Sequence, residues 1–162
     1  MVKNEFVITR LFDAPRELVW RAWTDPKHVM KWWGPKNFTA PYCVIDLKVG
    51  GTFHFCMRSP DGQEYWNKGV YQEIKAPERI VSTIYFSDRE GNYVEPGKAH
   101  PGFQDFPHEN IDVVTFENLE GGKTRFTLHR DFDIEAAKRY GMDQGWSQSL
   151  DKFAECLKLV ER

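Results

Sequence analysis

The 162-residue sequence lacks the features that mark several large classes of protein. No stretch approaches the ~18 consecutive apolar residues of a membrane-spanning helix. Its start, MVKNEFVITRLF, has neither the apolar core nor the small-residue cleavage site of a secretory signal. The net charge is −2, with no run of five like charges, whereas a surface for nucleic acid or anionic membrane needs a basic face. We therefore expect a cytoplasmic protein without a membrane span or a nucleic-acid partner.

Motifs for metal binding and nucleophilic catalysis are also missing. The three cysteines, Cys43, Cys56 and Cys156, are odd in number and show no CxxC spacing, so we expect reduced, mostly buried thiols. The five histidines show no HxH, HxxxH or Cys/His ligand spacing, which predicts no metal site and no cofactor. No GxSxG elbow occurs. The sequence therefore assigns no catalytic residue.

Aromatic residues are abundant, and apolar residues follow a helical period at the end of the chain. With 6 Trp and 12 Phe, the chain can build a thick core and still line a cavity. The segment GMDQGWSQSLDKFAECLKLVER predicts one long helix, because its apolar residues recur every three or four positions. These residues are Met142, Trp146, Leu150, Phe153, Leu157 and Val160. Two short helices are predicted earlier, beginning at Asp13-Ala14-Pro15 and Thr24-Asp25-Pro26.

The remaining segments are rich in β-branched and aromatic residues and are joined by short turns containing Gly or Pro. Such short connections predict antiparallel neighbours. The expected strands are residues 4–12, 38–49, 52–58, 65–75, 79–87, 110–118 and 124–132. The pattern predicts a single α+β domain over residues 1–162, with two short helices after the first strand and a long C-terminal helix covering one curved seven-stranded sheet.

One connection, residues 88–108, is longer than the connections usual in compact domains. Its aromatic residues Tyr93, Phe103 and Phe106 favour a segment that folds back onto the protein surface. Two interpretations remain open: a lid over the mouth of a cavity, and a decorated hairpin without a binding role.

Four motifs in register resemble the AHSA1-like branch (activator of Hsp90 ATPase homologue) of the START-like, or SRPBCC, superfamily. They are DAPRELVWRAWTDPKHVMKWWGP, VGGTFHF, GVYQEIKAPERIVST and GMDQGWSQSLDKFAECL. The resemblance runs from about Phe6 to Val160. It implies a helix-grip fold, in which the sheet wraps around the C-terminal helix, and a hydrophobic cavity between the helix and the sheet. It implies no catalytic residue.

The side-chain alternation of the strands predicts which residues face this cavity. From the expected strands, the long helix that faces them and the end of the second short helix, we predict a wall of apolar residues with one serine. The candidates are Trp33, Phe38, Phe53, Phe55, Met57, Ile80, Ser82, Ile84, Phe86, Phe126, Leu128, Met142, Trp146, Leu150 and Phe153.

These patterns and the functions that the family resemblance implies leave three hypotheses open. The leading hypothesis is the binding of a small hydrophobic or aromatic molecule in the cavity, driven by the removal of apolar area from water. The second is a co-chaperone-like protein-interaction module that uses the outside of the sheet. The third is a cyclase- or aromatase-like enzyme, which would need ionisable residues inside the cavity.

Overall fold

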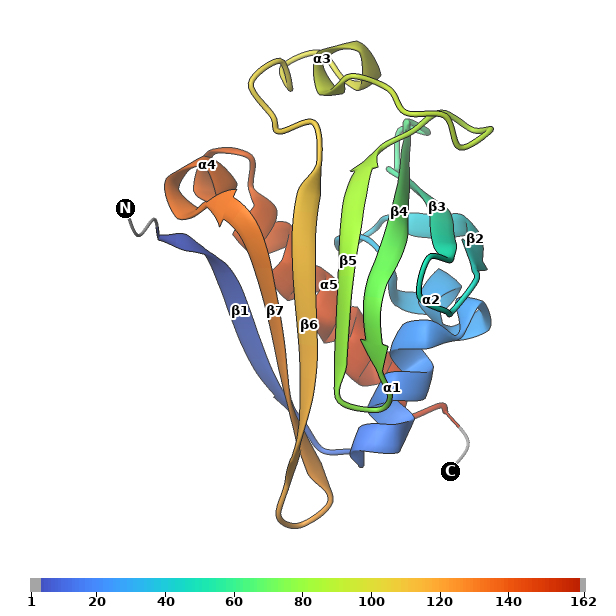
Figure 1. Ribbon diagram of the computed structural model, residues 1–162, viewed down its shortest axis with the longest axis vertical. Coiled ribbons are helices and arrows are strands. Elements are labelled where there is room, and N and C mark those ends of the chain that lie inside the picture. The colour runs from blue at the N-terminus through green and yellow to red at the C-terminus, as the bar shows by residue number, and fades with distance from the viewer. Residues whose placement is uncertain (1–3, 161–162) are drawn as a thin grey trace.

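The computed structural model describes residues 4–160 and contains one seven-stranded antiparallel sheet, in the order β1-β7-β6-β5-β4-β3-β2 (Figure 1). The strands are β1 (Glu5–Phe12), β2 (Thr39–Ile45), β3 (Thr52–Arg58), β4 (Glu64–Lys75), β5 (Arg79–Phe86), β6 (Asn110–Leu119) and β7 (Lys123–Asp133). The second strand ends before the predicted residue 49, because residues 46–51 form a turn in which the Gly51 N–H donates to the Lys48 carbonyl. The predicted α+β class and the predicted sheet are confirmed.

Gly69 allows two neighbouring strands and a core ring to pack closely at the middle of the sheet. A Cβ atom at this position would lie 2.0 Å from the Thr83 carbonyl oxygen and 2.1 Å from Cζ of Phe53. Any side chain here would therefore collide with backbone and with a buried ring.

Helices cover one face of the sheet (Figure 1). The long helix α5 (Met142–Leu157) crosses this face. The helices α1 (Arg16–Thr24) and α2 (Pro26–Trp32) pack against α5. The Asp25 carboxylate accepts a hydrogen bond from the Lys27 N–H at the start of α2, which explains the helix signal in the sequence. No helix within residues 4–160 is long and apolar enough to cross a membrane.

Two short helices were not predicted from the sequence. They are α3 (Pro96–Ala99), within the long connection, and α4 (Ile134–Arg139), which directly precedes α5. Asp133 caps α4 by accepting a hydrogen bond from the Ala136 N–H. Both helices are too short to give a readable hydrophobic period. Between α4 and α5 the chain reverses at Gly141, whose φ of 70° lies in the left-handed region.

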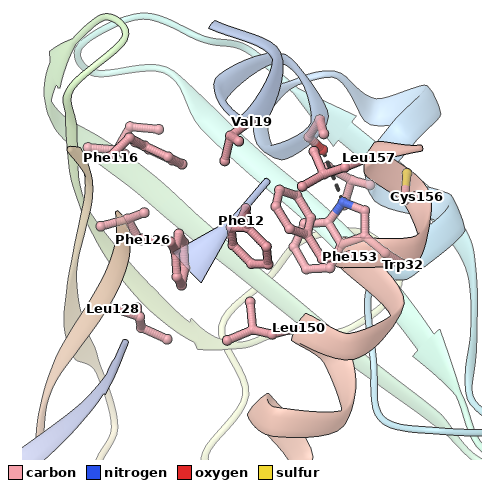
Figure 2. Close-up of a cluster of buried hydrophobic side chains, with 14 of the residues drawn as sticks. Phe12, Val19, Trp32, Phe116, Phe126, Leu128, Leu150, Phe153, Cys156 and Leu157 are labelled. Atoms are coloured by element: carbon pink, nitrogen blue, oxygen red, sulfur yellow. Dashed lines mark hydrogen bonds between the residues drawn. The ribbon is translucent and has the colours of Figure 1, made fainter. Parts of the chain in front are cut away.

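The core lies between the sheet, the helices α1 and α2, and the C-terminal half of α5 (Figure 2). Fully buried Phe126, Leu150 and Phe153 meet there. The indole N–H of buried Trp32 donates to the Ala22 carbonyl at 3.0 Å, which satisfies its polar atom. Trp23 lies at the centre of an aromatic cluster, with ring centroids 4.8 Å from Trp32 and 4.9 Å from Phe126. This half of the helix–sheet interface is solid.

Candidate functional site: an apolar cavity with a buried arginine

The other half of the interface contains a cavity of about 300 Å³, beside the first turns of α5. This volume is at the lower end of the range for small-molecule sites. The helix and the chain that leads into it contribute Tyr140, Gly141, Met142, Gly145, Trp146 and Ser149. The strands contribute Met57, Tyr65, Asn67, Ile84, Tyr85, Phe86, Asn110 and Arg130. The turn after α2 adds Trp33, Gly34, Pro35 and Phe38, and the long connection adds Phe103, Phe106 and Pro107.

The predicted cavity residues divide into two groups. Those that line the cavity are Trp33, Phe38, Met57, Ile84, Phe86, Met142 and Trp146. Those that are buried away from it are Phe53, Phe55, Ile80, Ser82, Phe126, Leu128, Leu150 and Phe153. The eight residues of the second group are buried, as inward-facing residues would be, but they pack in the core and do not line the cavity as predicted. Strand alternation and the helix stripe give the direction of a side chain, not the volume that α1 and α2 fill opposite it. The large rings of Trp23 and Trp32 occupy the volume that a single covering helix would have left empty.

An arginine from β7 places a positive charge at the cavity wall. Arg130 is 7% exposed, and its guanidinium donates through Nε to Oδ1 of Asp112 at 2.6 Å and through Nη2 to Oδ2 at 2.8 Å. Burial opposes the charge, but Asp112 offsets burial by its charge and hydrogen bonds and raises the pKa of Arg130 above its usual value. Arg130 therefore stays charged inside an apolar wall.

Arg130 and Asp112 were not predicted as site residues, although the sequence contains the signal for Arg130. It continues the inward alternation of Phe126 and Leu128 along the same strand. A charged residue in phase with core residues indicates either a buried ion pair or a binding group. Tyr140, by contrast, gave no signal, because the short helix α4 that precedes it was not predicted.

Lys152 fixes the turn that forms one wall of the cavity. Its ammonium donates to the carbonyl oxygens of Gly34 at 3.1 Å, Pro35 at 3.3 Å and Phe38 at 3.0 Å. Burial lowers the pKa of Lys152, but three acceptors match its three protons. This side chain ties α5 to the turn between α2 and β2.

The long connection folds back onto the protein, as its aromatic residues predicted. Phe106 packs against Phe86, Phe132 and Tyr140 at centroid distances of 5.3, 4.9 and 5.1 Å. His100 is buried against Tyr65, with ring centroids 4.3 Å apart, and burial lowers its pKa. The connection thus supplies part of the cavity wall. That it opens and closes as a lid stays a prediction.

The carboxylates of Glu64, Glu73 and Asp112 do not line the cavity, and each is paired with an arginine. Glu64 is paired with Arg58 at 2.7 Å and Glu73 with Arg79 at 2.8 Å, both on the protein surface. Asp112 is held by Arg130. Among residues 4–160, no three His, Cys, Asp or Glu side chains come together in a group that would hold a metal ion.

All three cysteines are buried and free of disulfides. Burial raises the pKa of the Cys43 thiol to about 12 and that of Cys56 to about 11. The pKa of Cys156 is also raised by burial. These thiols stay protonated near neutral pH and are poor nucleophiles.

Fold and site together define a helix-grip protein with a largely apolar cavity beside its long helix. The family described as "Activator of Hsp90 ATPase homolog 1-like protein" matches residues 13–158, and the chain belongs to this family. No curated protein matches the chain.

Solved structures with the same fold come from several bacteria. A protein of Chromobacterium violaceum is 27% identical, with a TM-score of 0.74, covering 98% of this chain and 99% of that one. A protein of Arthrobacter aurescens is 25% identical, with a TM-score of 0.80 and coverages of 98% and 88%. A protein of Nitrosomonas europaea is also 25% identical, with a TM-score of 0.76 and coverages of 96% and 94%.

Proposed function

We propose that this protein binds a small hydrophobic or aromatic molecule in the cavity beside α5. The observation that carries the proposal is the cavity itself, about 300 Å³ in volume and walled largely by aromatic and aliphatic side chains such as Trp33, Trp146 and Ile84. Small-molecule sites are typically apolar cavities with a few polar groups that set orientation. Family membership supports the proposal, since this fold family generally has a ligand-binding cavity.

The gain on binding comes from apolar surface removed from water, at about 25 cal/mol per Å². Indole rings add contact area at low cost in conformational entropy. The walls are also held in place before binding. Lys152 anchors the turn that carries Pro35 and Phe38, and the aromatic rings of the long connection pack against β5. A preformed cavity avoids part of the ordering cost of binding.

The two alternative functions have less support from the described residues. An enzyme needs free acid–base groups, but Arg130 is paired with Asp112. Burial raises the pKa of Tyr65 and Tyr85 in the cavity wall, which makes these phenols poor bases. A protein-interaction module would use the outside of the sheet, where the exposed apolar residues are spread over several strands, with Leu11 on β1, Ile111 on β6 and Val44 on β2. We expect the protein to act in the reducing cytoplasm, where its three buried thiols stay free.

Native mass spectrometry of protein purified without detergent tests the proposal. The expected result is a stoichiometric small apolar molecule that is released on denaturation and identified by its mass. An empty protein that also fails to bind a panel of neutral naphthalene and biphenyl derivatives would contradict the proposal.

A further inference from the structure

The buried arginine in the cavity wall has hydrogen-bond donors that its ion pair does not use. A guanidinium carries five N–H groups, and Asp112 accepts one from Nε and one from Nη2. Within residues 4–160, the partner of Nη1 is the thioether sulfur of Met142, at 4.0 Å. Sulfur of this kind is a weak acceptor. Arg130 therefore presents strong donors, with a weak and replaceable partner, to a cavity that it lines.

The charges around Arg130 indicate what kind of acceptor fits there. Asp112 compensates the guanidinium by direct bidentate contact, and Asp131 adds a second negative charge on the same strand. The next cation on α5, Lys152, lies ten residues beyond Met142, about 15 Å along the helix. Its three protons are already engaged by backbone carbonyls. A carboxylate next to Arg130 would thus bring excess negative charge into an apolar site, which is costly.

A neutral oxygen acceptor both pairs with the free donors of Arg130 and avoids adding negative charge to the site. It accepts the free N–H groups of Arg130 without adding charge, and its polar atom loses no hydrogen bond when it leaves water. Asn110, 3% exposed and also in the cavity wall, directs its amide N–H toward Asp131. The end of the cavity at Arg130 and Asn110 is therefore arranged around donors held by carboxylates. The rest of the wall is mostly apolar, with polar groups only from the side chains of Tyr65, Asn67, Tyr85, Tyr140 and Ser149.

We infer that the occupant of this cavity is an uncharged aromatic or apolar molecule with a carbonyl-type oxygen that accepts a hydrogen bond from Nη1 of Arg130. This inference rests on the proposed function and specifies its ligand class. It also places the molecule, with its oxygen toward β7 and Met142 and its apolar body toward Trp146 and Trp33.

Three naphthalenes of nearly equal shape test the inference by isothermal titration calorimetry. They are 2-acetylnaphthalene, a neutral ketone; 2-isopropylnaphthalene, which has no acceptor; and 2-naphthoate, an anion. The wild type is expected to bind the ketone about tenfold or more tightly than the hydrocarbon, as befits a hydrogen bond to a charged donor. It is also expected to bind the ketone more tightly than the carboxylate.

A double variant isolates the role of the arginine. Arg130→Met alone would leave Asp112 as an unpaired buried charge, so the test uses Asp112→Leu with Arg130→Met, a replacement that buried ion pairs often tolerate. This variant is expected to keep its affinity for 2-isopropylnaphthalene and to lose the preference for the ketone. The matched control, Glu117→Leu with Arg125→Met, removes an exposed ion pair from the same two strands and should keep the preference.

The outcomes separate the inference from the proposed function. Equal affinities of the wild type for ketone and hydrocarbon, or tightest binding of 2-naphthoate, would overturn the inference and leave cavity binding intact. A ketone preference that persists in the folded Asp112/Arg130 double variant would also overturn it. Failure of all three compounds to bind the wild type would contradict the proposed function itself.

Discussion

Gly145 lowers the stability of α5, but its missing side chain leaves volume in the cavity. It is the fourth residue of the helix and lines the cavity. A Cβ atom built on it would meet only Cγ of Pro35, at 3.6 Å, which is an ordinary van der Waals distance. Glycine within a helix costs about 1 kcal/mol relative to alanine. Close packing therefore does not require a glycine at this position. A larger side chain would instead take up volume in the cavity, which explains why glycine fits a binding site here.

Two substitutions separate these effects. Gly145→Ala should stabilise the protein by about 1 kcal/mol, which raises the melting temperature by about 2–4 °C for a domain of this size. It should leave ligand binding nearly unchanged, because one methyl group fits against Pro35. Gly145→Leu has a similar helix propensity but directs its larger side chain into the cavity. It should remain folded and weaken the binding of 2-isopropylnaphthalene at least tenfold, or about 1.4 kcal/mol.

Thermal unfolding followed by circular dichroism and calorimetric titration measure the two quantities on the same samples. The alanine variant is the control for the leucine variant, since both remove the glycine. If Gly145→Leu is folded and binds as tightly as the wild type, the ligand does not occupy the space beside the first turns of α5. If Gly145→Ala is destabilised, this position is restrained by something other than the cavity.

Three further predictions concern the structure around the cavity. Gly69→Ala should destabilise the fold by about 3 kcal/mol, because its methyl group collides with backbone and a core ring; an unchanged denaturation midpoint would refute the close packing. Burial lowers the pKa of His100, so below its ordinary value of 6.5 the unfolded chain takes up a proton that the folded protein resists. Stability should therefore fall as the pH drops from about 7.5 to about 5.5, and less steeply in His100→Phe; parallel pH profiles of melting temperature would contradict this. Lys152→Met should cost about 1–3 kcal/mol and speed ligand release, because three carbonyls lose their donor; Lys158→Met, in an exposed pair with Glu155 just after the last residue of α5, is the control and should have little effect.

The sequence predicted the sheet well, because its signals were local and agreed with one another. Alternating apolar residues marked each strand, and glycine or proline marked most of the turns. The apolar face predicted for the long helix was also correct at Leu150, Phe153 and Leu157, which are buried. Val160 lies beyond the last helical residue, yet it is still buried in the core.

The position of the cavity could not be predicted in the same way, because it depends on volumes that meet only in the folded protein. Strand alternation gives the face on which Phe126 or Ile84 points, but it does not tell whether another side chain fills the space opposite. The ring of Phe126 packs against Trp23 of α1, whereas Ile84 lines the cavity. The polar end of the site depends on a pairing between β6 and β7, in which Asp112 lies opposite Arg130.

The most direct test of the account is the location of a bound neutral ligand by nuclear magnetic resonance. Intermolecular nuclear Overhauser effects from bound 2-acetylnaphthalene are predicted to reach the methyl groups of Met57, Ile84 and Met142, which line the cavity. Contacts instead to exposed Leu11 or Val44, on the edge strands, would place the ligand on the protein surface and contradict the central claim.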